Sequence, residues 1–152
     1  MNGGRGGKAG AVSRGLFAWG MGMGERDLAR LLSAMEPVLM AEPYGYAHLA
    51  KGAVVPQMAA FATVHEAEGV TMIAPLAVLD AAGFMGMQPW ARITLTVHSD
   101  LEAVGLTAAF AGALGARGIS ANVVAGYFHD HIFVQWARRG DAMAALEALR
   151  DV

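Results

Sequence analysis

The clearest alternation of apolar and polar residues runs over residues 92–97 and predicts a β-strand. The apolar side chains point to one face of this strand: Ile93, Leu95 and Val97. The polar side chains point to the other face: Arg92, Thr94 and Thr96. Because successive side chains of a strand point to opposite faces, this pattern is typical of a strand with one apolar face.

A helix is predicted directly after this strand. Ser99 and Glu102 have the Ser-x-x-Glu spacing of a capping box, in which two side chains bind free backbone amides at the start of a helix. The apolar residues that follow have helical spacing: Leu106, Phe110, Ala113 and Leu114. Gly118 can take the left-handed conformation that commonly ends a helix. We therefore expect a helix that begins at Ser99 and ends before Gly118.

Two further strands and a helix complete the C-terminal half. The β-rich segments 119–127 and 132–136 flank the polar turn Phe128-His129-Asp130-His131. Asp141 can cap a last helix, whose apolar stripe has four members: Ala142, Ala145, Leu146 and Leu149. The predicted order of strand, helix, two strands and helix is most of a ferredoxin-like βαββαβ unit.

The N-terminal half contains a helix, about three strands and a second helix. Residues 25–35 have helical spacing, with four apolar side chains on one face: Leu28, Leu31, Leu32 and Met35. Residues 38–49 are expected to form one or two short strands, because Pro43 and Gly45 interrupt them. A hairpin with its turn at residues 66–69 joins strands at 58–65 and 70–74. A short helix at 76–82 follows Pro75, and residues 84–89 form a linker.

Long stretches of the chain resemble ACT domains, small regulatory modules that typically bind amino acids. In the C-terminal half these stretches are TVHSDLEAVGLTAAF and ALGARGISANVVAGYFHDHIFV. In the N-terminal half, GERDLARLLSAMEPVL and FATVHEAEGVTMIAP resemble the first part of a bacterial family of tandem ACT-domain proteins. The resemblance covers residues 24–149 and implies two ACT-like units side by side.

We therefore expect an α+β fold made of two tandem ferredoxin-like units, with antiparallel sheets and helices packed on one face. The N-terminal unit should span residues 24–86 and the C-terminal unit residues 87–152. Residues 1–23 are rich in glycine and have little apolar side chain to pack, so we expect a disordered extension there.

The composition of the chain argues against some classes of binding partner and favours self-association. The net charge of −2, with Arg138-Arg139 as the only adjacent basic pair after residue 23, argues against nucleic acid. No apolar run reaches the roughly 20 residues that span a bilayer, so we expect a cytoplasmic protein without a membrane partner. The absence of cysteine excludes disulfides and thiol nucleophiles. Because 55% of the residues are hydrophobic and only 16% charged, we expect a homodimer or larger assembly.

Several polar residues could bind a metal ion or take part in catalysis. His129, Asp130 and His131 could bind a metal together with His98, which would make the protein a metal-dependent enzyme. The alternative is an ordinary polar turn. His98-Ser99-Asp100 has the residue types of a catalytic triad, but consecutive residues cannot form its relay of hydrogen bonds. We therefore expect no catalysis and no cofactor.

The start of the helix predicted at Ser99 is the leading candidate for a binding site. Free amides and the helix dipole favour an anion there, such as the carboxylate of an amino acid, and Asp100 or Asp130 could bind its ammonium group. The resemblance implies that the strand containing Asn122 also contributes. Capping and close packing alone would equally explain these residues. The predicted ligand-binding residues are His98, Ser99, Asp100, Leu101, Val104, Gly105, Leu106, Asn122, Val123, Tyr127 and Asp130.

Three functions are consistent with this pattern. The first is a non-catalytic regulatory module that binds a small molecule, as the resemblance implies an amino acid, and acts by ligand-dependent association. The second is a structural oligomerisation module without a ligand. The third is the metal-dependent enzyme with His98, His129, Asp130 and His131.

Overall fold

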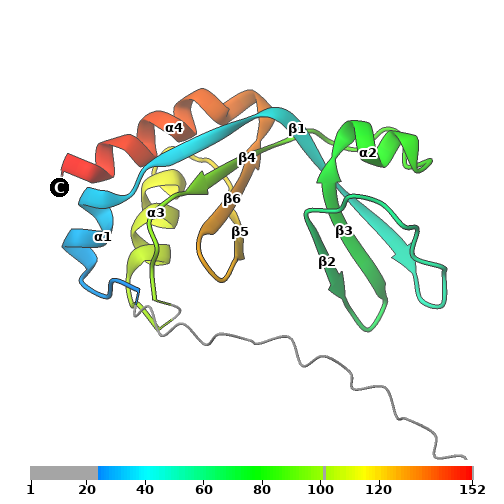
Figure 1. The fold of residues 1–152 in the computed structure, drawn as a ribbon. Helices are drawn as coiled ribbons and strands as arrows, with labels where there is room; N and C mark the ends of the chain where they lie inside the picture. The colour runs from blue at the N-terminus through cyan, green and yellow to red at the C-terminus, as the bar shows by residue number, and fades with distance from the viewer. Residues whose placement is uncertain (1–23, 101, 152) are drawn as a thin grey trace, which may run out of the picture.

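The computed structural model describes residues 24–100 and 102–151, and the extension predicted for residues 1–23 lies outside this part of the chain. The strands form a single curled antiparallel sheet of six strands in the order β2-β3-β1-β4-β6-β5 (Figure 1). The strands are β1 (Pro37–Ala50), β2 (Ala62–His65), β3 (Gly69–Pro75), β4 (Trp90–Leu95), β5 (Asn122–Ala125) and β6 (Asp130–Gln135). The α-helices are α1 (Leu28–Ala34), α2 (Leu76–Ala81), α3 (Leu106–Gly115) and α4 (Arg139–Glu147). None of these helices is long and apolar enough to cross a membrane.

Strand β1 joins the two halves of the sheet. Residues 37–39 and 43–44 pair with β4, and residues 44–50 pair with β3. The sequence predicts one or two short strands here, whereas the chain forms a single strand of 14 residues. The register shifts between Leu39 and Pro43. An irregularity of this kind accommodates proline, which has no N–H group for the ladder.

Each half of the sheet has the strand order of a ferredoxin-like unit. In the C-terminal half, β4, α3, β5, β6 and α4 follow one another, and the first part of β1 supplies the strand that would come after α4. In the N-terminal half, the later part of β1 is followed by β2, β3, α2 and the start of β4. A ferredoxin-like unit has a helix between its first two strands, but here residues 51–61 connect these strands without forming a helix. The fold class predicted from the sequence is therefore confirmed, with β1 and β4 shared by both units.

The predicted apolar stripes form the core between the helices and the sheet. The buried helical side chains include Leu31 and Leu32 of α1, Phe110 and Leu114 of α3, and Ala145 and Leu146 of α4. They pack on alternate residues of the central strands, such as Ile93 and Ile132. Helix α2 packs on Ala47 and Ala74, which the register places on the same face of the sheet. All four helices therefore cover one face.

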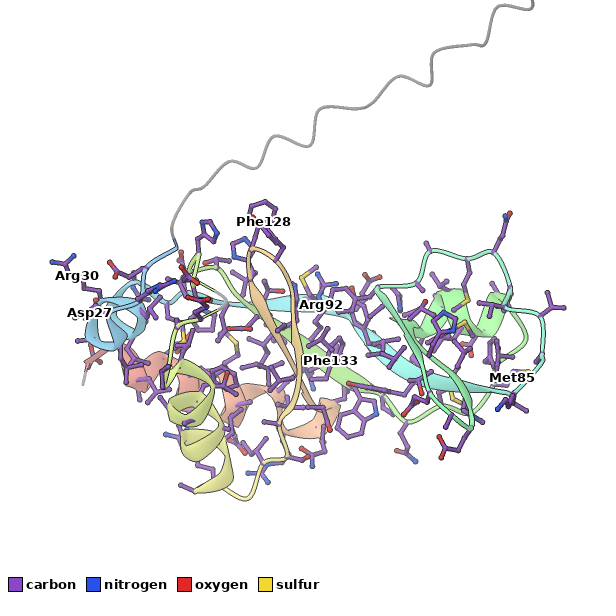
Figure 2. The ribbon with its side chains drawn as sticks, turned by 90° about the horizontal axis from the view of Figure 1, so that it is seen from below. Asp27, Arg30, Met85, Arg92, Phe128 and Phe133 are labelled. Carbon is purple, nitrogen blue, oxygen red and sulfur yellow. The ribbon has the colours of Figure 1, made fainter. Side chains whose placement is uncertain are left out.

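The face without helices is covered by aromatic side chains. Tyr44, Phe61 and Phe133 form its centre, and Phe133 is fully buried. Arg92, which the alternation assigned to the polar face of its strand, has its guanidinium 5.0 Å from the centre of the Tyr44 ring and 4.5 Å from that of Phe61. Figure 2 shows Arg92 and Phe133 between the two halves of the molecule. The polar face of β4 is therefore enclosed, because residues from the N-terminal half fold over it.

Candidate functional site

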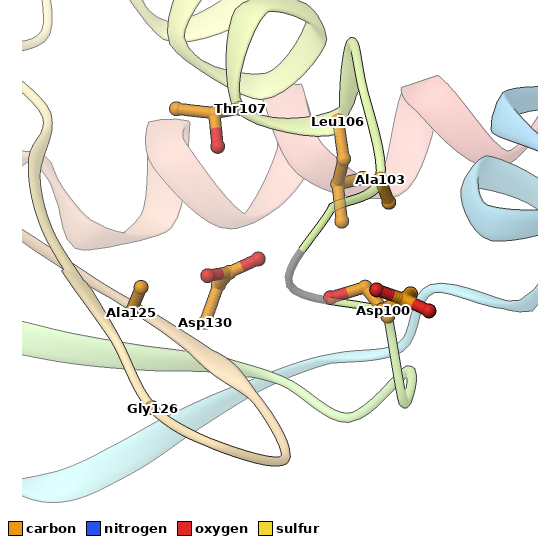
Figure 3. A pocket seen from close by; sticks show the side chains of 8 residues that line it. Asp100, Ala103, Leu106, Thr107, Ala125, Gly126 and Asp130 are labelled. Atoms are coloured by element: carbon orange, nitrogen blue, oxygen red, sulfur yellow. The ribbon is translucent and has the colours of Figure 1, made fainter. Parts of the chain in front are cut away.

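A small cavity lies between the start of α3 and the turn that joins β5 to β6. Its volume is about 110 Å³. Figure 3 shows the Thr107 hydroxyl and the Asp130 carboxylate pointing toward the same space from opposite sides. The side chains and backbone that line the cavity belong to Ser99, Asp100, Ala103, Leu106, Thr107, Ala125, Gly126 and Asp130.

The N-cap of helix α3 lies six residues later than predicted. The prediction of a capping box at Ser99 and Glu102 is wrong, because α3 starts at Leu106 and its N-cap residue is Gly105. The φ of Gly105 is 101°. The backbone N–H of Glu102 is instead bound by the Asp100 carboxylate at 2.9 Å, which makes a local turn. The first amides of a helix have no partner within it, and in α3 no capping side chain binds them. They lie beside the cavity, which Leu106 and Thr107 line.

The left-handed conformation of Gly105 makes it sensitive to substitution. Gly105→Ala should lower the free energy of unfolding by about 1–2 kcal/mol, the cost of that conformation for a residue with a Cβ atom. The new Cβ would also lie 3.0 Å from Leu28 Cδ2. Gly112→Ala is the matched control within the same helix, where a Cβ meets no atom within 4 Å. It should raise the stability by about 0.5–1 kcal/mol. Urea denaturation measures both; equal effects of the two substitutions would contradict this start of α3.

Asp130 supplies a second carboxylate to the lining of the cavity. Among residues 24–100 and 102–151, no group donates a hydrogen bond to this carboxylate. Burial raises the pKa of Asp130 above its usual range, and the charge of His129 offsets part of that increase. Ionising a half-buried carboxylate is costly, so a cationic group placed in the cavity would stabilise its charged form.

Asp100 is already engaged by other groups. It accepts hydrogen bonds from the backbone N–H of Glu102 and from Arg26 Nε, at 2.9 and 3.0 Å. The hydrogen bond from the Glu102 backbone, followed by that from Arg26, lowers the pKa of Asp100. Of the two carboxylates that the sequence suggested for an ammonium group, Asp130 is therefore the one that remains available.

The structure brings together only part of the predicted ligand-binding set. Ser99, Asp100, Leu106 and Asp130 line the cavity, and Gly105 adjoins it. The other described members do not line it: His98, Val104, Asn122, Val123 and Tyr127. Leu101 lies outside the described residues.

The residues that do not line the cavity have identifiable surroundings. Val104 and Tyr127 are 84% and 63% exposed. Asn122 lies at the start of β5, four positions before Gly126, and donates a hydrogen bond to the Phe133 carbonyl. The His98 ring lies 5.5 Å from that of Phe128.

Four lining residues were not predicted: Ala103, Thr107, Ala125 and Gly126. Ala125 and Gly126 interrupt the apolar pattern of their strand, which was a usable signal for a close approach. Thr107 could have been identified as the polar side chain in the first turn only if the start of α3 had been placed correctly.

The four residues of the proposed metal site are not brought together. Asp130 and His131 are neighbours on β6 and therefore point to opposite faces of the sheet. His131 Nδ1 is hydrogen-bonded to Thr94 Oγ1 at 3.0 Å on the face without helices. Within the described residues, no three His, Asp or Glu side chains are grouped so that they could hold a metal ion.

Comparisons with known proteins agree with this architecture. Two models of the ACT domain match the chain, one over residues 23–91 and the other over residues 88–148. No curated protein matches it. A crystal structure of a Vibrio cholerae protein of unknown function, described as a possible transport protein, is 45% identical. That alignment covers 81% of this chain and 95% of the other, with a TM-score of 0.71.

Two more distant structures share the fold alone. A protein from Agrobacterium tumefaciens is 15% identical over 76% of this chain and 89% of its own, with a TM-score of 0.65. The regulatory subunit of aspartate kinase from Thermus thermophilus, in its ligand-free form, is 8% identical. The alignment covers 76% of this chain and 98% of that subunit, with a TM-score of 0.53.

Proposed function

The chain belongs to the ACT-domain family, with two such domains in tandem, and from that premise we propose that it is a non-catalytic regulatory module that binds an amino acid. The ligand occupies the cavity between α3 and the β5–β6 turn. Ligand binding favours one arrangement of the protein over another and so changes its association with a partner or with a second copy.

This proposal rests on the opposite polarity of the two walls of the cavity. The uncapped first turn of α3 offers amide donors and the positive end of a helix dipole, which favour a carboxylate by about 0.3–1 kcal/mol. Each amide hydrogen bond to the charged group would add roughly 1.5–3 kcal/mol. The opposite wall offers the carboxylate of Asp130, which favours an ammonium group. An α-amino acid carries both groups on one carbon atom.

The size and charge of the cavity favour a small amino acid without an acidic side chain. The volume of about 110 Å³ is smaller than the roughly 300–1,000 Å³ of typical ligand pockets, so the cavity suits a small ligand. No basic side chain is among the residues that line the cavity. A second carboxylate on the ligand would therefore lie near Asp100 and Asp130 without a compensating positive charge.

A thermal-shift screen at several pH values tests the proposal. Glycine, alanine, serine and threonine should raise the melting temperature more than aspartate and glutamate. At a hundred times its dissociation constant, a ligand adds roughly 2.7 kcal/mol to the stability. Because the ammonium group needs ionised Asp130, affinity should fall by up to about tenfold per pH unit below the raised pKa of Asp130.

The pH dependence of stability in the unliganded protein is the control for the pH dependence of ligand binding. A carboxyl whose pKa is raised by folding stabilises the folded state below its unfolded pKa, and this contribution is lost as the pH rises through the folded pKa. Ligand-induced stabilisation should therefore increase with pH over the range in which the contribution of Asp130 to the unliganded fold decreases. A panel in which no amino acid changes the melting temperature would contradict the proposed function.

A structural oligomerisation module is the second candidate. It is favoured by exposed apolar side chains around the β5–β6 turn, where Tyr127 and Phe128 are 63% and 59% exposed, and by the absence of charged residues in the edge strand β5. We propose a homodimer or larger assembly under either function. Light scattering on a size-exclusion column measures this; assembly without any effect of amino acids would favour the second candidate.

A further inference from the structure

The segment before α1 lies against the loop that forms one wall of the cavity. The backbone N–H of Glu25 donates to the His98 carbonyl, and the N–H of Asp100 donates to the Glu25 carbonyl, both at 3.2 Å. These two bonds form an isolated parallel bridge between Glu25 and Ser99. Ser99 and Asp100, which line the cavity, are therefore held by backbone bonds from a segment more than 70 residues away in the sequence.

Arg26 adds a forked side-chain contact to the same loop. Its Nε donates to Asp100 Oδ2 at 3.0 Å, and its Nη2 donates to Glu102 Oε2. The side chain of Asp100 is 15% exposed, whereas that of Glu102 is 76% exposed, so the bond to Asp100 is the better shielded of the two. The planar guanidinium allows this fork, which a lysine ammonium group does not reproduce.

Close packing fixes both ends of the contact. At Gly24 a Cβ atom would lie 2.3 Å from the backbone nitrogen of Asp100, so only glycine fits there. At the other end, the Leu28 side chain packs over Gly105, the N-cap of α3. Residues 24–28 therefore touch the loop where it enters the cavity wall and where it passes into the helix.

We propose that residues 24–28 act as a clamp that sets the conformation of the site loop, defined as residues 98–100 and 102–105, and that Arg26 is its positioning residue. Arg26 keeps the Asp100 carboxylate bound, so that among the described residues Asp130 is the lining carboxylate without a donor. The effect of the clamp on ligand affinity rests on the proposed function, whereas its effect on the loop can be measured without a ligand.

Hydrogen exchange on the full chain tests the clamp directly. Arg26→Gln should increase the exchange rate of the Asp100 and Glu102 amides several-fold and leave the central strands unchanged. Arg30→Gln is the matched control, because the Arg30 side chain is 78% exposed and its ion pair among the described residues is with the Glu25 carboxylate, at 3.7 Å, rather than with the site loop. It should leave the site loop unchanged. Identical exchange in the two variants and the wild type would overturn the proposal.

The titration of Asp130, followed by NMR, separates positioning from a general loss of structure. In Arg26→Gln the released charge of Asp100 should raise the Asp130 pKa further, because like charges disfavour ionisation. The charged groups that act on the two carboxylates are His129 for Asp130, and Arg26 and His98 for Asp100. Adding Asp100→Asn to Arg26→Gln should restore the wild-type midpoint, and Arg26→Lys should shift it less than Arg26→Gln does. A midpoint that does not move in Arg26→Gln would contradict the role of Arg26.

The amino-acid panel distinguishes failure of the clamp from failure of the proposed function. With L-alanine as the probe, Arg26→Gln should weaken binding while Arg30→Gln leaves it unchanged. If the probe binds the wild type and Arg26→Gln equally, the clamp is wrong and the binding site stands. If no amino acid of the panel binds any variant but the exchange and titration results hold, the clamp stands and the proposed function is wrong.

Discussion

Replacing Phe133 with alanine is expected to lower the free energy of unfolding by about 3–5 kcal/mol. The Phe133 side chain has no exposed surface. Its ring lies 5.5–5.7 Å from the rings of Tyr44, Tyr46 and Phe61, in edge-to-face arrangements. These partners come from the N-terminal half of the chain, so the substitution removes contacts between the two halves as well as apolar area. A loss of this size is a large fraction of the typical stability of a domain.

Denaturation with urea, followed by tryptophan fluorescence, measures this effect. Met85→Ala is the control, because Met85 is 79% exposed in the segment between α2 and β4, and its loss should change the stability by no more than about 0.5 kcal/mol. If Phe133→Ala cost less than about 1 kcal/mol, the face without helices would not be a packed core. A second transition in Phe133→Ala would show that the aromatic cluster couples the two halves.

Asp130→Asn is expected to weaken the binding of an amino acid by roughly ten- to a hundredfold. The substitution keeps the shape of the side chain but removes the charge that would bind the ammonium group, an interaction worth about 1.5–3 kcal/mol. The folded state should keep or gain stability near neutral pH, because burial raises the pKa of Asp130 and its charged form therefore costs stability in the unliganded fold. Calorimetric titration with L-alanine measures the change in affinity.

Asp80→Asn provides the comparison for this variant. Asp80 is exposed on α2, in the other half of the chain, and does not line the cavity. It should bind the probe as the wild type does. Equal affinity of the wild type and Asp130→Asn, in a protein that does bind amino acids, would place the ammonium group elsewhere.

The sequence by itself predicted the elements whose signal is periodic and local. The alternation at residues 92–97 corresponds to β4, and the helical spacing of Leu31 and Met35, or of Phe110 and Leu114, identifies buried faces of helices. The hairpin turn at residues 66–69 also formed as expected. Such patterns are readable because the geometry of a strand or a helix fixes which residues share a face, whatever the rest of the chain does.

The start of α3 shows where local reasoning fails. Ser99 and Glu102 have the spacing of a capping box, yet the loop around them is held by Glu25 and Arg26 and leads to a left-handed Gly105. A contact between residues so far apart in the sequence leaves no periodic signal. The side chain that accepts the Glu102 amide is therefore that of Asp100, and the helix begins later.

The candidate site was predicted only in part for the same reason. Ser99, Asp100, Leu106 and Asp130 were identified, because they flank the predicted helix start and the polar turn. Asn122 was placed in the site, although the register of β5 against β6 puts it opposite Phe133, away from Gly126. The boundary between units at residues 86 and 87 stays a prediction, since β1 and β4 serve both halves.

Sequence therefore determined the number and type of most elements, their apolar faces and the family of the fold. Tertiary structure decided that β1 completes the C-terminal unit, that Arg92 packs on aromatic rings, and that Arg26 binds Asp100 rather than Asp130. Each of these outcomes depends on pairing or packing between distant segments. Such contacts are selected by the burial of apolar surface and the satisfaction of polar groups over the whole molecule, which no local pattern encodes.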